Sequence, residues 1–265
     1  MKTLKRILAA TTLLVTLGFA SEANAQVPLE NFFKNPEKAG YQISPDGKYF
    51  SYMAPYENRL NLFVQEVGSD KATRITSETV RDLAGSMWAN GHRILYIKDT
   101  AGDENFQLYG VNVDGTDSKA YTAFPKVRTT IIDPLENIDS LVIIGLNKRN
   151  PQVFDPYRLN LNNGELTQLA ENPGNIQGWM TDHNGKLRVA LAIVDGVNTQ
   201  ILYRETEEQP FRPVLTTNFR ETVSFATFTP DNKMVYALTN IGRDKTALVL
   251  MDPATCEEKR STLHQ

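Results

Sequence analysis

The sequence of 265 residues contains a single cysteine, Cys256, so no disulfide can form within the chain. It has only three histidines, His92, His183 and His264, and none of them has a second ligand at the spacing of a zinc motif. The phosphate-cradling P-loop and the glycine fingerprint of dinucleotide-binding folds are also missing from the sequence. We therefore expect neither a metal site nor a cofactor.

Long hydrophobic runs are absent except at the amino terminus. There, three basic residues precede an apolar run at residues 7–20, and the small-residue pattern Ala23-Asn24-Ala25 follows. This is the layout of a signal peptide, and the run is shorter than the roughly 20 residues that span a bilayer. We predict that residues 1–25 are a signal peptide cleaved after Ala25. The mature protein would then be exported, periplasmic or secreted, without a membrane span.

An excess of positive charge is also absent. After residue 25 the chain carries 25 basic and 30 acidic residues, a net charge of −5, and no long basic run interrupts it. Nucleic-acid binding therefore has no electrostatic support. With 41% hydrophobic and 22% charged residues, the composition is that of a soluble globular protein.

The sequence does contain a repeat, seen best at residues 41–52. Two β-prone runs flank Ser44-Pro45-Asp46-Gly47, in which proline presets φ, aspartate can bond its own backbone and glycine accepts a positive φ. Degenerate copies of this turn occur at residues 88–91, 133–137, 182–185 and 229–232. Alignment of Ser44, Trp88, Ile132, Thr181 and Phe228 gives spacings of 44, 44, 49 and 47 residues. Propeller blades repeat at about 40–50 residues.

Each unit continues with a third alternating strand and, after a polar turn, a short outer strand. The third strands are expected at residues 61–67, 106–113, 155–161, 200–204 and 246–251, and outer strands at residues 73–76 and 166–169. A β-sandwich also has short strands, but it lacks a fixed four-strand period. We predict an all-β protein, a β-propeller with about five four-stranded blades, in one domain at residues 26–265.

A catalytic nucleophile is not recognisable. The chain lacks G-x-S-x-G, and its nearest fragment, residues 84–88, has no second glycine and lies in a predicted strand. Trp88 and Trp179, each near the end of a first strand, suit core packing better than a ligand cage. The candidate substrate-binding residues are Asp103 and Glu104, in the loop at residues 99–105, where a carboxylate could hold a cationic substrate group. The alternative is a solvated loop, because acids are common in loops.

Three segments carry a resemblance to a known family. They are residues 28–36 leading into Tyr41–Gly47, residues 102–109, and Asp155-Pro156-Tyr157-Arg158-Leu159-Asn160. In this combination the chain resembles the amino-terminal propeller of bacterial exported serine peptidases of the prolyl oligopeptidase family, which include dipeptidyl peptidases and acylaminoacyl peptidases.

The resemblance implies a propeller of seven or eight blades followed by an α/β-hydrolase domain that holds the Ser, Asp and His of a catalytic triad. Seven blades need about 315 residues, whereas residues 26–265 supply 240. We therefore expect an incomplete propeller, with the hydrolase domain and its catalytic residues absent and the chain inactive alone. The implied role is to gate peptide substrates for the missing hydrolase.

Two other functions stay open at this point. One is a self-contained five-bladed binding or scaffolding module of the periplasm. The other is a five-bladed glycoside-processing enzyme, which would need paired carboxylates at the centre of the blades, where the sequence offers only scattered acids such as Asp82 and Asp133. Peptide specificity, total blade number and oligomeric state do not follow from the sequence.

Overall fold

The structure is a computed structural model that describes residues 27–34 and 36–261. The predicted signal peptide therefore lies outside the described residues, as does His264. Residues 27–34 belong to a separate compact unit, with a 3-10 turn, η1 (Leu29–Phe32). The turn leaves Leu29, Phe32 and Phe33 at least two-thirds exposed. In the described part of the chain no helix is long and apolar enough to cross a membrane.

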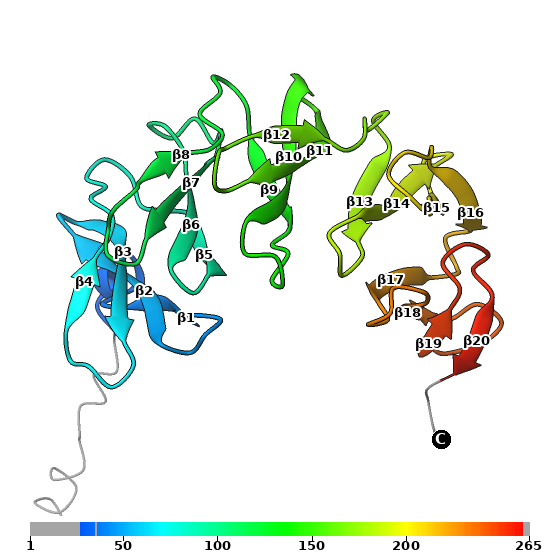
Figure 1. Cartoon of the computed structure of the whole chain (residues 1–265), viewed down its shortest axis with the longest axis horizontal. Helices are drawn as coiled ribbons and strands as arrows, with labels where there is room; N and C mark the ends of the chain where they lie inside the picture. Colours follow the sequence, from blue (N-terminus) through cyan, green and yellow to red (C-terminus); the bar gives the residue numbers. More distant parts are fainter. Residues whose placement is uncertain (1–26, 35, 262–265) are drawn as a thin grey trace, which may run out of the picture. The chain divides into compact units, whose positions relative to one another are not determined.

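The unit that begins at Pro36 consists of five four-stranded antiparallel sheets, each formed by consecutive strands (Figure 1). The first two are β1 (Ala39–Ile43), β2 (Tyr49–Tyr56), β3 (Arg59–Glu66), β4 (Ala72–Arg74), and β5 (Gly85–Asn90), β6 (Arg93–Lys98), β7 (Gln107–Asn112), β8 (Lys119–Ala120). The third is β9 (Thr129–Asp133), β10 (Leu141–Asn150), β11 (Val153–Asn160), β12 (Leu166–Gln168). The last two are β13 (Ile176–Thr181), β14 (Leu187–Val194), β15 (Asn198–Tyr203), β16 (Arg212–Thr217), and β17 (Val223–Phe228), β18 (Val235–Thr239), β19 (Ala247–Met251), β20 (Glu258–Ser261).

This architecture confirms the predicted units of four strands. One turn was misplaced: Trp88, Ala89 and Asn90 belong to β5, and the chain reverses at Gly91 and His92. The error arises because this turn is shorter than those of the other copies: only Gly91 and His92 separate the paired residues Asn90 and Arg93.

The turn Ser44-Pro45-Asp46-Gly47 forms as its residues require. The Ser44 hydroxyl donates to Asp46 Oδ1 (2.7 Å), the Lys48 amide donates to the same oxygen (3.2 Å), and Gly47 has a φ of 71°. The hydrogen bond from Ser44, followed by that from the Lys48 backbone, lowers the pKa of Asp46 to about 2. Thr229 and Asp231 repeat this arrangement in the fifth sheet, so the recurring sequence signal has a recurring physical cause.

Three buried hydrophobic cores hold neighbouring sheets together. One contains Leu62 and Ile94 of the first and second sheets, another Leu95 and Ile144 of the second and third, and the last Ile201 and Val235 of the fourth and fifth. In the described chain, none of these three cores spans the third and fourth sheets, although β9 and β13 are in contact. This junction is therefore built differently from the others.

Cys256 lies in the turn between β19 and β20, with a φ of 58°, and packs against the core of the fourth and fifth sheets. Burial, with a smaller contribution from Asp252, raises the pKa of its thiol to about 11. The thiol is therefore neutral at neutral pH, and the side chain acts as a packing residue.

Candidate functional site

The predicted loop at residues 99–105 joins β6 to β7, and its Asp103 shapes the loop. Asp103 Oδ1 accepts hydrogen bonds from the amides of Thr100 (3.2 Å) and Asn105 (3.0 Å), while Oδ2 accepts one from Asn105 Nδ2 (3.1 Å). The Asn105 hydrogen bonds lower the pKa of Asp103. The carboxylate is exposed and stays ionised in neutral solution.

Glu104 follows with its side chain exposed and its backbone at a positive φ of 56°. Its amide donates to Oδ2 of the buried Asp99 (3.3 Å), and Asp99 Oδ1 accepts from Arg81 Nε (3.4 Å). Asp99 is thus paired with Arg81, whereas the carboxylates of Asp103 and Glu104 stay exposed. Exposed carboxylates of this kind suit a cationic group.

A direct hydrogen bond connects this loop to the third sheet. Phe106 follows the loop, and its carbonyl accepts from the amide of Thr129 (2.8 Å), the first residue of β9. The acidic loop and the start of β9 thus lie at the same end of their sheets.

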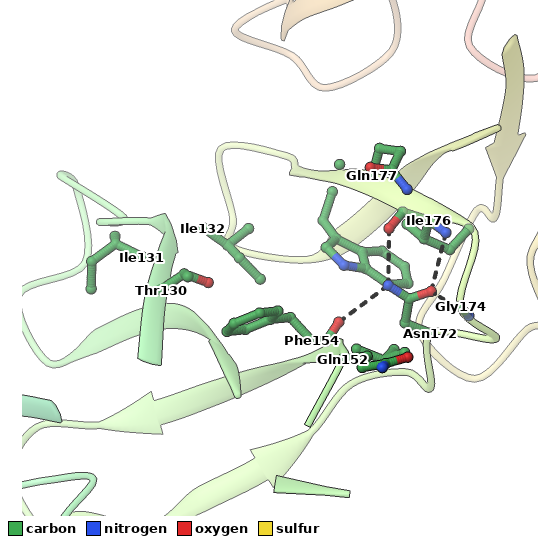
Figure 2. Close-up of a pocket in the computed structure, with 12 residues that line it drawn as sticks. Thr130, Ile131, Ile132, Gln152, Phe154, Asn172, Gly174, Ile176 and Gln177 are labelled. Atoms are coloured by element: carbon green, nitrogen blue, oxygen red, sulfur yellow. Dashed lines mark hydrogen bonds between the residues drawn. The ribbon is translucent and has the colours of Figure 1, made fainter. Parts of the chain in front are cut away.

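Next to Thr129 begins the interblade cleft, our name for a cavity of about 470 Å³ between the third and fourth sheets. Figure 2 shows Thr130, Ile132 and Phe154 on one side of it and Asn172, Ile176 and Gln177 on the other. Gln152, Trp179 and further backbone and apolar groups complete the lining. None of the twelve lining residues carries a formal charge.

The glycine at position 145 allows the third-sheet wall of the cleft to form. Gly145 on β10 pairs with Thr130. A Cβ atom at Gly145 would lie only 2.6 Å from Thr130 Oγ1 and 3.5 Å from Ile132 Cδ1 and Phe154 Cβ. Any larger residue would displace these side chains, so the close approach requires glycine.

An ionic network around the buried Asp155 supports the fourth-sheet wall. Asp155 is fully buried, and its carboxylate accepts hydrogen bonds from Arg149 Nε (2.8 Å), Arg149 Nη2 (2.9 Å) and the Asn172 amide (2.7 Å). Arg149 Nη2 also donates to the Asn172 carbonyl (2.8 Å). The Asn172 side chain in turn bonds the backbone of Phe154, Gly174 and Ile176. The connection between β12 and β13 is thereby fixed against β11.

Among the described residues, we find no set of metal ligands and no serine hydrogen-bonded to a histidine base. No cluster of three or more His, Cys, Asp or Glu residues there has the geometry to hold a metal ion. Ser86, at the fragment nearest to a nucleophile motif, lies within β5. His183 contacts the fifth sheet: its Nε2 lies 3.0 Å from the Phe228 carbonyl, and its amide donates to Asn232 Oδ1 (2.9 Å). This histidine joins the turns of the fourth and fifth sheets.

Sequence reasoning missed the interblade cleft and placed Trp179 in a core, whereas Trp179 lines the cleft and contacts Phe211 (5.6 Å between ring centroids). Trp88, by contrast, packs against the core of the first and second sheets. One available signal was Gly145, which interrupts the apolar strand Leu141–Leu146. An isolated glycine in a strand indicates a close approach of neighbouring groups.

No protein-family model matches the chain. The chain is 31% identical over 232 residues to Dipeptidyl aminopeptidase BIII of Pseudoxanthomonas mexicana, a match that covers 84% of this chain and 33% of that protein. It is 28% identical over 200 residues to Dipeptidyl peptidase family member 6 of Caenorhabditis elegans, covering 72% of this chain and 26% of that protein. The match thus spans at most about a third of either relative.

Among solved structures, a prolyl endopeptidase superposes with a TM-score of 0.59 at 12% identity, covering 85% of this chain and 36% of that one. At this identity the likeness concerns the fold, a propeller of four-stranded sheets. The fold and the sequence relation together confirm the resemblance inferred from the sequence.

Proposed function

We propose that this chain, a propeller portion homologous to that of dipeptidyl peptidases in the prolyl oligopeptidase family, controls which peptides reach the hydrolase that performs the chemistry. The observation that carries the proposal is the 31% identity to a dipeptidyl aminopeptidase, which runs through 84% of this chain but through only a third of the relative. Catalysis belongs to the rest of such a protein, and the sheets select substrates by their size and by their amino end.

Two features of the sheets support this role. The acidic loop of Asp103 and Glu104 presents exposed carboxylates that suit the protonated amino terminus of a peptide. The interblade cleft lies beyond the Phe106–Thr129 hydrogen bond, at the same end of the sheets. A peptide held at the loop would therefore meet the cleft next.

The gating role predicts a size effect in a chimera. Residues 27–261 would replace the matched region of Dipeptidyl aminopeptidase BIII, and kcat/KM would be measured for a dipeptidyl 4-nitroanilide and for unfolded casein. We expect the chimera to favour the short substrate over casein at least about tenfold more strongly than the hydrolase remainder alone does, a difference of about 1.4 kcal/mol in transition-state binding. Equal preference in the chimera and the remainder would exclude gating.

The acidic loop predicts selectivity for a free amino group. In the same chimera, Glu104→Gln should raise KM for a dipeptidyl substrate by up to about fivefold, since exposed ion pairs contribute about 0.2–1 kcal/mol. Asp103→Asn should act in the same direction. The N-acetylated substrate should be unaffected, as should the matched variant Asp70→Asn in a turn of the first sheet. A similar rise for both substrates would assign Glu104 a purely structural role.

We also infer export, which is supported by the basic and apolar pattern of residues 1–25. Expressed from its full sequence in a bacterium, the chain should be recovered outside the cytoplasm with Gln26 as its first residue. Amino-terminal sequencing checks this, and recovery of a cytoplasmic chain that retains residues 1–25 would refute the inference.

A further inference from the structure

We propose that the interblade cleft binds an uncharged, extended segment of a peptide, so that it selects neutral residues near the substrate's amino end. The proposal rests on the proposed function for its substrate class, peptides, and adds to it a second recognition site and a preference. The size of the cleft, about 470 Å³, falls within the range of small-ligand sites.

The charge of the lining determines what the cleft excludes. All twelve residues around it are formally neutral. The buried Asp155 carboxylate, which follows the lining residue Phe154 in the chain, is already bound by Arg149 and the Asn172 amide. A charged side chain that entered the cleft would lose hydration without gaining a counter-ion. Neutral residues do not incur this cost.

The unused hydrogen-bonding groups indicate what the cleft attracts. Asn172 is fully engaged, as the dashed lines in Figure 2 show, with Oδ1 accepting from Gly174 and Ile176 and Nδ2 donating to Phe154 and Ile176. The side chains of Thr130, Gln152 and Gln177, in contrast, make no hydrogen bond to any residue that the structure describes. Hydroxyl and amide groups both donate and accept, so they match the alternating N–H and C=O groups of an extended peptide.

Apolar side chains also line the cleft. Ile132 and Phe154 line the cleft from the third sheet, and Trp179 lines it from the fourth. Such a mixture, apolar walls with a few placed polar groups, is typical of ligand sites. It suits neutral side chains that project from a peptide whose backbone meets Thr130, Gln152 and Gln177.

The junction that contains the cleft is held by polar contacts away from it. Arg158 Nη2 donates to the Gly185 carbonyl (2.9 Å) and to Glu207 Oε1 (2.7 Å), and Thr181 donates to Asp133. The three hydrophobic cores lie at the other junctions. Leu135 and Ile138 of the third sheet also lie against Gly185 of the fourth, but none of the buried residues of the three cores lines the cleft.

Trp179 provides a direct probe, because the chain has only one other tryptophan, Trp88. The Trp88→Phe protein would be titrated with acetyl-Ala-Leu-Ala-amide and with acetyl-Ala-Glu-Ala-amide while the emission of Trp179 is recorded. We expect a saturable shift with the neutral peptide and binding of the acidic one weaker by about tenfold or more, equivalent to about 1.4 kcal/mol. The Trp179→Phe protein, which keeps Trp88, should show no shift.

Variants at the rim test the assignment further. Gln177→Glu should weaken binding of the neutral peptide, and Thr130→Val should do the same, whereas the matched change Gln168→Glu on the outer strand β12 should leave it unchanged. Circular dichroism of each variant would verify folding. No response of Trp179, equal affinity for both peptides, or equal effects of Gln177→Glu and Gln168→Glu would overturn the proposal.

The two proposals fail separately. If Trp179 does not respond but the chimera still discriminates by size, gating stands and the cleft is not a binding site. If the peptide binds but the chimera does not discriminate, the cleft binds peptides without a gating role.

Discussion

Replacement of Asp155 by alanine is expected to lower the free energy of unfolding by about 2–4 kcal/mol. Asp155 is fully buried, and its carboxylate accepts two hydrogen bonds from Arg149 and one from the Asn172 amide. Its loss leaves the Asn172 N–H without a partner and frees the cation. Removal of one member of a fully buried pair costs about 3–5 kcal/mol. Arg149 is 40% exposed and can be hydrated after Asp155 is lost, so we expect a smaller loss of unfolding free energy.

Urea unfolding followed by circular dichroism measures this change, and the melting temperature should fall by about 5–10 °C. Lys48→Met is the matched control, because Lys48 forms an ion pair with Asp46 (3.1 Å) while its side chain is 71% exposed, and such pairs contribute about 0–1 kcal/mol. If Asp155→Ala lowered the free energy of unfolding no more than Lys48→Met does, the network would not support the wall of the cleft.

The purified chain is expected to show no hydrolysis of peptides or esters and no labelling by a fluorophosphonate. A nucleophilic serine needs an adjacent base that is itself oriented. Neither histidine in the described residues, His92 or His183, hydrogen-bonds a serine hydroxyl, and the nearest motif fragment places Ser86 within β5.

The chimera with the remainder of Dipeptidyl aminopeptidase BIII is the positive control for this experiment and should be labelled. Labelling of the isolated chain, abolished by Ser86→Ala or by another single serine variant, would instead show that these sheets contain a reactive serine.

Much of the fold could be predicted because its signals are local. The Ser44–Gly47 turn and the alternating third strands, such as Arg59–Glu66, are set by neighbouring residues. An outer strand was predicted for every unit, but its residues were given only for the first and third. In the second sheet this strand is only the two residues Lys119 and Ala120, and a strand this short has no pattern. Its pairing is imposed by β7 rather than by its own composition.

The site could be predicted only in part, for a different reason. Asp103 and Glu104 are contiguous and charged, so the sequence alone identified the loop. The turn-forming hydrogen bonds of Asp103 could not be predicted from the sequence. The interblade cleft gathers Thr130, Gln152 and Gln177, which are far apart in the sequence and neutral. No local pattern marks such a set, because only the packing of two sheets brings its members together.

If these sheets serve a peptidase as its propeller, the chimera should process a dipeptidyl 4-nitroanilide. We expect residues 27–261, joined to the remainder of Dipeptidyl aminopeptidase BIII, to give a kcat/KM within about tenfold of the parent enzyme, a loss of at most about 1.4 kcal/mol. A folded chimera that retains fluorophosphonate labelling but does not process the dipeptidyl substrate would contradict this expectation.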